Sequence, residues 1–337
     1  MKYKRLNFEE REEISRGIWA DESFTDIAQR LHRQVSTISN EVYANVCYKK
    51  RSYHAIKAQA LSAEQRKKQA KPKKLDTNTK LRAYVYGKLR QEWSPEEIAK
   101  RIKLAYPTDM TMRISHETIY DYLYCLPRGE LKKELLKALR QERKFRFNRK
   151  AVHAKRSTIT DFLSISERPK EVKDRVVAGH WEGDLIMGSK ASNSAMGTLV
   201  ERTTRLTLLV PLEKKDAMSV REAFAKSFKR IPKIFKKTLT YDRGTEMAQH
   251  RLFTENTKIQ VYFADPHSPW QRGTNENTNG LIRQYFPKGT DFKTVSLSAI
   301  KLAEHRLNSR PRKALEYRTP SEKFYELTTG KAIALGA

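Results

Sequence analysis

The stretch that decides the fold is Gly179-His180-Trp181-Glu182-Gly183-Asp184-Leu185-Ile186, in which an acid sits among apolar residues. The pattern predicts a largely buried strand over residues 181–187. An unpaired carboxylate in such a strand is unfavourable unless it meets a metal ion or another cation. Asp184 is therefore a candidate metal ligand. Glu182, two positions earlier on the same face, is expected to support it.

A second acid, Asp242, ends the expected strand 237–241 and is followed by the tight turn Arg243-Gly244. Glu246, just beyond that turn, is another supporting candidate. The sequence around the two acids alternates expected strands and helices. The strands are 181–187, 196–201, 206–212, 237–241 and 259–264, and the helices are 216–228, 246–256 and 268–286. This order predicts an α/β domain with a mixed sheet flanked by helices, in which side chains from several elements converge at one end of the sheet.

A third acid, Glu276, lies in Ser268-Pro269-Trp270-Gln271-Arg272-Gly273-Thr274-Asn275-Glu276-Asn277. Its assignment is the least obvious from physics alone, because a helix rich in Asn and Arg can carry it as a surface residue. Mg²⁺ takes one or two carboxylates together with phosphate oxygens. Two such ions about 3.5–4 Å apart hold the attacking and leaving oxygens of an in-line displacement. Asp184, Asp242 and Glu276 therefore resemble the ligands of a two-metal nuclease that uses Mg²⁺, with Mn²⁺ as a substitute.

The composition predicts a polyanionic partner. The 337 residues include 68 Lys+Arg against 39 Asp+Glu, a formal charge of +29, which favours binding to nucleic acid. Cys47 and Cys125 form no paired motif, so a disulfide framework and a zinc knuckle are both disfavoured and a reducing compartment is expected. The chain begins without an apolar signal core and has no stretch long enough to span a membrane. We therefore expect a cytoplasmic protein without a membrane partner.

The amino-terminal region has the pattern of a helix-turn-helix. Apolar residues recur from Ile27 to Leu31 and from Val35 to Val42, separated by His32-Arg33-Gln34, and an earlier helix containing Ile14 closes the core. The second helix of the pair would enter a major groove. The candidate DNA contacts are Arg33, Ser36, Thr37, Ser39 and Asn40. The alternative is a three-helix bundle without DNA contact.

A second helical pair follows. Ser94-Pro95-Glu96-Glu97 is a strong helix start, with Ser94 as the cap and Glu97 as its capping-box partner. Another helix begins after Ser115, and its His116 and Thr118 are candidate DNA contacts. His116 has no second histidine or cysteine at ligand spacing, so a metal site there is disfavoured.

Two runs of basic residues are typical of solvated linkers and place the domain boundaries. We expect a helix-turn-helix module over residues 1–48, a basic linker over 49–80 and a second helix-turn-helix module over 81–139. A second basic linker over 140–170 and a catalytic core over 171–330 complete the chain.

Together these motifs resemble the DDE transposases of the IS-thirty family of bacterial insertion sequences. The resemblance rests on the segments 36–39, 93–99, 114–120, 179–184, 240–244, 268–277, 307–313 and 319–320. One departure is Asn40, where the family pattern predicts an arginine, and the zinc-binding module of retroviral integrases is absent from the sequence. The resemblance implies a ribonuclease-H-like catalytic core in which Asp184, Asp242 and Glu276 are the catalytic, metal-binding triad.

The resemblance also implies an activity. The protein would bind the double-stranded terminal inverted repeats of an element, cut at its ends and join the 3′ hydroxyl to target DNA, as at least a dimer in the bacterial nucleoid. Arg272 and Arg283 would contact the phosphate backbone. Trp270 would either stack a displaced base or anchor the core.

Two rival functions use the same features. The first is a DNA-binding regulator with an inactive nuclease-like domain, which the presence of all three acids disfavours. The second is a ribonuclease or junction resolvase of the same fold, which the two end-binding modules disfavour.

Overall fold

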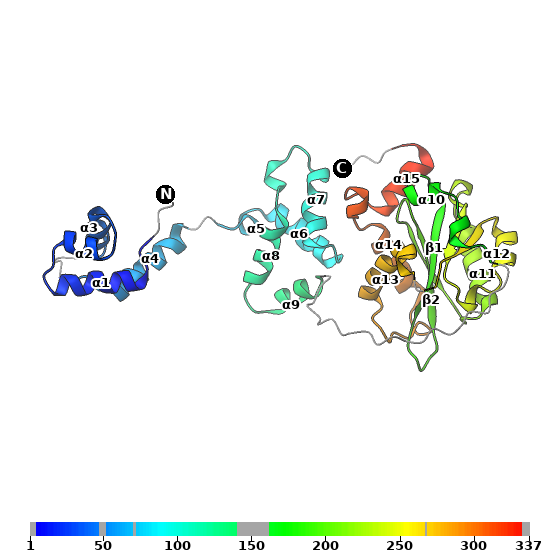
Figure 1. The fold of residues 1–337 in the computed structure, drawn as a ribbon, viewed down its shortest axis with the longest axis horizontal. Helices are drawn as coiled ribbons and strands as arrows, with labels where there is room; N and C mark the ends of the chain where they lie inside the picture. The colour runs from blue at the N-terminus through cyan, green and yellow to red at the C-terminus, as the bar shows by residue number, and fades with distance from the viewer. Residues whose placement is uncertain (1–4, 47–51, 70–71, 140–161, 267, 332–337) are drawn as a thin grey trace. The chain divides into compact units, whose positions relative to one another are not determined.

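The computed structural model describes residues 5–46, 52–69, 72–139, 162–266 and 268–331. The chain divides into two compact units, Met1–Thr77 and Asn78–Ala337, which are considered one at a time (Figure 1). Within the described residues, no helix is long and apolar enough to cross a membrane.

The first unit contains the three helices of the expected helix-turn-helix module and two further helices. Its helices are α1 (Phe8–Trp19), α2 (Phe24–Arg30), α3 (Val35–Ala44), α4 (Ala55–Gln69) and the short α5 (Lys74–Thr77). Capping boxes at Asn7 and Ser23 start α1 and α2. Helix α4 lies in the segment expected to be a linker, yet Tyr53 and Ala58 are fully buried in the same core as Ile38. The charge run hid these apolar residues, so part of that segment completes the module.

The second unit begins with four helices. They are α6 (Thr79–Arg90), α7 (Pro95–Ala105), α8 (His116–Cys125) and α9 (Glu130–Lys137), and we call them the helical module. The expected cap of α7 is present, with Ser94 and Glu97 forming a capping box, and Ser115 caps α8. Buried residues such as Val85, Ile98 and Ile119 form the centre of this module.

The rest of the second unit is built on a five-stranded mixed sheet, as predicted. The strands are β1 (His180–Met187), β2 (Ala195–Glu201), β3 (Thr207–Pro211), β4 (Thr238–Tyr241) and β5 (Gln260–Phe263), in the order β3-β2-β1-β4-β5. Strands β1, β2 and β3 form an antiparallel meander, whereas β4 and β5 run parallel to β1. Three antiparallel strands followed by two strands parallel to β1 form the mixed sheet that the order of elements predicts.

Helices cover both faces of the sheet (Figure 1). Helices α11 (Ala217–Phe228) and α12 (His250–Thr257) lie on one face, over a core that includes Trp181, Phe224 and Leu239. Helices α13 (Gly273–Tyr285) and α14 (Leu297–Asn308) lie on the other, over a core that includes Ile186 and Leu281. Alternate residues of β1 therefore face opposite layers, and Asp184 faces α13.

Shorter elements complete the second unit. They are η2 (Met110–Met112), η3 (Ile165–Glu167), α10 (Glu171–Asp174), η4 (Lys233–Phe235), η5 (Thr245–Met247), η6 (Pro269–Arg272), η7 (Lys313–Leu315) and α15 (Pro320–Thr329). The single helix expected over 268–286 is thus a 3₁₀ turn followed by α13. The break falls at Gly273, just after Arg272.

Candidate active site

Asp184 lies in the middle of β1 with its carboxylate held from two sides. The backbone N–H of Leu185 donates to Oδ1 at 2.9 Å, and the Asn279 side chain of α13 donates to Oδ2 at 2.8 Å. Burial raises the pKa of Asp184; the charge of Arg272 opposes this effect and that of Asp242 adds to it. An acid in this environment favours a compensating cation.

Asp242 directly follows β4, the strand next to β1. The backbone N–H of Gly244 donates to its Oδ1 at 3.3 Å, so the tight turn predicted from Arg243-Gly244 orients the carboxylate. Because β1 and β4 are parallel neighbours, Asp184 and Asp242 lie at the same end of the sheet, as expected.

The guanidinium of Arg272 bridges the two aspartates. Nη2 lies 3.0 Å from Asp242 Oδ2, Nη1 lies 3.5 Å from Asp184 Oδ1, and Nη1 also donates to the carbonyl of Gly183 at 3.1 Å. Burial acts to lower the pKa of Arg272, but the charges of Asp242 and Asp184 outweigh it and the pKa is raised. Sequence reasoning placed Arg272 on DNA, whereas the structure directs it at the two acids.

Glu276 lies in the first turn of α13, the helix that packs against β1. Positions 276, 279 and 283 share one face of α13, and Arg272 immediately precedes the helix. Arg272 and Asn279 both contact Asp184, and Arg283 donates to the carbonyl of Met187 at 2.8 Å. Glu276 itself is exposed. Across the described ranges no group of three His, Cys, Asp or Glu side chains has metal-binding spacing, so the structure does not gather Glu276 with the two aspartates.

Glu182 is fully buried and anchors the start of α13. One carboxylate oxygen accepts the backbone N–H of Asn275 at 2.9 Å, and the other lies 2.9 Å from Arg202 Nη1. The position of Glu276, next in sequence to Asn275, therefore depends on this buried ion pair. A supporting role was predicted for Glu182, but its partner Arg202 was not.

Two polar side chains missed by sequence reasoning orient the site. Thr198 of β2 pairs with Asp184 in the sheet register, and its hydroxyl lies 3.2 Å from the Asn279 carbonyl oxygen. This contact leaves the Asn279 amide nitrogen directed at Asp184. The sequence feature that could have indicated this role of Asn279 is its position three residues after Glu276. Glu246 is nearby, and burial, followed by the charges of Asp242 and Asp184, raises its pKa.

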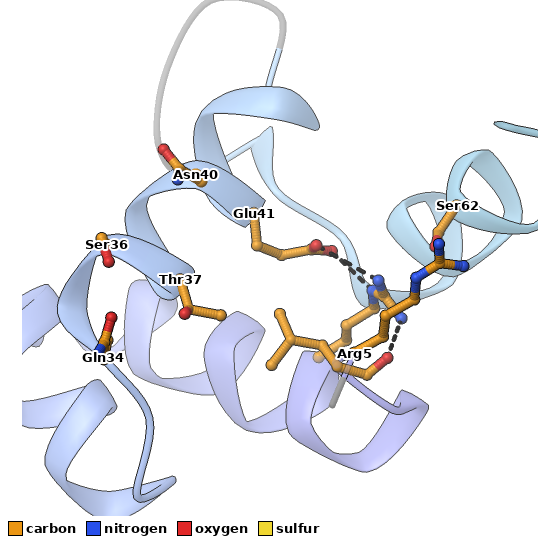
Figure 2. A pocket seen from close by; sticks show the side chains of 9 residues that line it. Arg5, Gln34, Ser36, Thr37, Asn40, Glu41 and Ser62 are labelled. Atoms are coloured by element: carbon orange, nitrogen blue, oxygen red, sulfur yellow. Dashed lines mark hydrogen bonds and ion pairs between the residues drawn. The ribbon is translucent and has the colours of Figure 1, made fainter. Parts of the chain in front are cut away.

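The candidate DNA contacts of the first unit divide into two groups. Ser36, Thr37 and Asn40 line a pocket of about 390 Å³ with Arg5 and with Ser62 of α4 (Figure 2). Arg33 is instead paired with Glu10 at 2.9 Å and is largely buried, so it stabilises the module.

The remaining candidate in α3 and the two in α8 make local contacts. The Ser39 hydroxyl donates to the carbonyl of Ser36 at 3.2 Å. In α8, Thr118 is exposed and its hydroxyl lies 2.9 Å from that of Ser115, whereas His116 lies 3.7 Å from Glu117. Trp270 is 73% exposed, so it does not anchor the core and stays available for stacking.

Comparison with known proteins agrees with this architecture. Residues 2–45 match a helix-turn-helix domain family, and residues 175–269 match the integrase core domain family, a range that includes Asp184 and Asp242 and ends before Glu276. The transposase for insertion sequence element IS1086 of Cupriavidus metallidurans is 43% identical over 321 residues, covering 95% of this chain and 94% of that protein. Transposase InsI for insertion sequence element IS30A of Escherichia coli is 44% identical over 320 residues, covering 94% and 82%.

The chain belongs to the IS30 family of transposases. The predicted family is thereby confirmed, as is a fold that combines a helix-turn-helix with an integrase core. The catalytic core of BIV integrase is 18% identical and covers 45% of the transposase, with a TM-score of 0.36. An IS30-family transposase is a DNA-cleaving and strand-transferring enzyme, so the rival regulator without catalysis is disfavoured.

Proposed function

We propose that this transposase binds the terminal inverted repeats of its insertion sequence, cleaves the phosphodiester bonds at the ends and joins each 3′ hydroxyl to target DNA. The observation that carries the proposal is the shared cation position of Asp184 and Asp242, which one guanidinium now fills. Two carboxylates that share a cation at the end of a sheet suit phosphoryl transfer better than DNA binding alone.

The residues present fit divalent metal ions. Asp184 and Asp242 offer hard oxygen donors that share one cation, and Glu276 in the first turn of α13 would supply the third carboxylate, a donor set that suits Mg²⁺ and admits Mn²⁺. When bound, the ions supply Lewis-acid activation of the attacking oxygen and charge neutralisation at the phosphate. Asn279 orients Asp184, while Glu182 fixes the start of α13 and with it Glu276.

The basic residues of the site then serve the substrate. Arg272 would be released from Asp184 and Asp242 if these acids held metal ions, and its fork of donors would then be free to bind a phosphate oxygen. Arg283, about two turns of α13 after Glu276, holds the end of β1 through the Met187 carbonyl and also donates to the carbonyl of Pro287 at 3.3 Å. Both arginines would thus position the scissile strand beside the three acids.

DNA recognition is assigned to the two helical regions. Ser36, Thr37 and Asn40 at the pocket of the first unit, and Thr118 on α8, are small polar groups suited to base edges and phosphates. The formal charge of +29 supplies the affinity that does not depend on sequence. We propose that the transposase works as a dimer or larger assembly on the DNA of the bacterial nucleoid, in the cytoplasm.

The test is cleavage of an end-labelled duplex that carries the inverted repeats flanking the gene. The wild type should cut in Mg²⁺ or Mn²⁺, whereas Asp184→Asn, Asp242→Asn and Glu276→Gln should each bind the duplex in a gel shift and fail to cut it. Glu222→Gln, on the exposed face of α11, is the matched control and should cut normally. A wild type that binds the repeat without cutting would favour the rival regulator, and full activity of Glu276→Gln would remove Glu276 from the triad.

A further inference from the structure

Two arginine–glutamate pairs join the helical module to the carboxyl-terminal segment of the catalytic domain. Arg310 is fully buried, and its Nε lies 2.9 Å from Glu97 Oε2 of α7. Arg101 of α7 forms the second pair with Glu322 of α15, in which Nη1 lies 2.9 Å from Oε2 and Nη2 contacts Oε1. We call these two pairs the latch. Each part of the protein gives one arginine and one glutamate to it.

Both glutamates of the latch also cap their own helices. Glu97 accepts the backbone N–H of Ser94 at 2.7 Å, and Glu322 accepts that of Thr319 at 2.8 Å. Each carboxylate is thus fixed before its arginine binds, which makes the docking geometry specific. A buried ion pair adds little net stability because of the desolvation of its charges, and its clearest use is to select one arrangement. The latch therefore points to a need for one defined orientation.

The latch extends to the helix that carries Glu276. Arg310 Nη1 donates to Gln284 Oε1 of α13 at 2.8 Å. The neighbouring Tyr285 is in contact with Glu92 of the helical module, and burial and then the charge of Glu92 raise the pKa of the Tyr285 hydroxyl. Since Glu182 holds the other end of α13 through Asn275, the helix is fixed between the sheet and the helical module.

Helix α8 packs on α7 through the buried side chains of Ile119 and Leu123 and exposes Ser115 and Thr118. Because the latch fixes α7, the exposed side of α8 is held at one distance from Asp184 and Asp242. We infer that Arg310 and Arg101 are positioning residues that set the spacing between the base pairs read by α8 and the phosphodiester bond that is cut. This inference rests on the proposed DNA contact of α8 and the proposed cleavage.

The experiment maps cut positions at nucleotide resolution on end-labelled repeat DNA, with the full-length protein. Arg101→Gln and Arg310→Lys weaken the latch, and Tyr317→Phe removes a further contact between the same two parts, the 2.7 Å hydrogen bond from the Tyr317 hydroxyl to Glu96. All three variants leave the three acids and the exposed side of α8 intact. We expect cuts to spread to neighbouring bonds and the rate at the correct bond to fall about tenfold to a hundredfold, because displacements of about 1 Å have effects of this size. Affinity for the repeat in a gel shift should be unchanged.

Two matched controls each remove an arginine–glutamate pair that lies within the helical module or within the carboxyl-terminal segment and does not connect the two. Arg90→Gln breaks the pair with Glu134 inside the helical module, and Arg318→Gln breaks the pair with Glu326 inside the carboxyl-terminal segment. Both should cut at the wild-type bond. Thermal melting checks that each variant folds. If the variant of the buried Arg310 fails to fold, the cut positions of Arg101→Gln, at a less buried arginine, test the inference.

Single-bond cutting at the wild-type rate by Arg101→Gln would overturn the inference. Slower cutting that stays at the wild-type bond would also overturn it, because a purely structural role of the arginine predicts a lower cleavage rate without a spread of cut positions. Failure of the proposed function looks different: the wild type itself would bind the repeat and leave it uncut, and both proposals would then fall together.

Discussion

The guanidinium of Arg272 lies 3.0 Å from the carboxylate of Asp242 and occupies the position between Asp242 and Asp184 that a divalent ion would need. A guanidinium and a metal ion cannot share it without strong repulsion. Loading of metal and release of Arg272 toward a phosphate are therefore expected to be one coupled event.

The first prediction follows from this competition. Arg272→Met should bind Mn²⁺ in the absence of DNA about tenfold more tightly than the wild type, because charge-assisted hydrogen bonds contribute about 1.5–3 kcal/mol that the ion must otherwise replace. Titration calorimetry measures the affinity. Arg272→Lys keeps the positive charge and should bind Mn²⁺ less tightly than Arg272→Met. The control is Arg243→Met, which removes an arginine that pairs with Asp265 and should bind Mn²⁺ as the wild type does. Equal affinity of wild type and Arg272→Met would contradict the competition.

The second prediction concerns Asn279. Its amide donates to Asp184 at 2.8 Å, and Asn279→Leu should lower cleavage about 10-fold to 100-fold, the usual effect of removing a group that orients a metal ligand. Initial cleavage rates across a range of Mg²⁺ concentrations measure the loss. Partial recovery at high Mg²⁺ would agree with weakened metal binding. Asn277→Leu, at an exposed position of the same helix, is the control and should change the rate little.

The third prediction concerns pH and His180, the first residue of β1. Burial lowers the pKa of His180 from its usual 6.5, although Glu171 opposes the shift. A lowered histidine pKa means that the folded state favours the neutral ring, so its contribution to stability is present above pH 6.5 and is lost as the pH falls through the folded-state pKa. The melting temperature of the wild type should therefore fall between pH 7.5 and pH 5.5.

The same melting curves contain the comparison that isolates His180. Replacement of the buried ring by His180→Gln should flatten the pH dependence, whereas replacement of the exposed His305 by glutamine should leave it as in the wild type. Each kcal/mol lost from the free energy of unfolding lowers the melting temperature by about 2–4 °C in a domain of this size. Identical slopes for the wild type and His180→Gln would show that other groups dominate the acid response.

Local sequence patterns predicted most of the fold because they report local physics. The buried strand around Asp184, the turn after Asp242 and the cap at Ser94 each depend on a few neighbouring residues, and all three are present. The contacts that sequence reasoning missed depend on distant partners. Arg310 meets Glu97 only after the chain has folded, and the charge run around α4 concealed the buried Ala58.

The site was predicted unevenly for the same reason. Two parallel neighbouring strands bring Asp184 and Asp242 to one end of the sheet, which the order of elements already indicates. The orientation of Arg272 toward these acids depends on the break before α13 at Gly273, and a single long helix was expected there. No pattern in the sequence marks where a helix will change from a 3₁₀ turn to α.

The last prediction concerns assembly. Transposition requires both ends of an element to be processed in one complex, and the chain divides into two compact units, of which the first is proposed to bind DNA and the second to bind and cut it. In the proposed arrangement the first unit of one subunit binds one DNA end while the catalytic site of another subunit cuts the other end. Inactive Asp242→Ala subunits should then inhibit assemblies that also contain wild-type subunits. Mixed in equal amounts with the wild type on paired-end DNA, they should reduce cleavage below half, because some assemblies then contain a defective site at a required position. Cleavage strictly proportional to the wild-type fraction, together with a monomeric mass of the DNA complex by light scattering, would rule the assembly out.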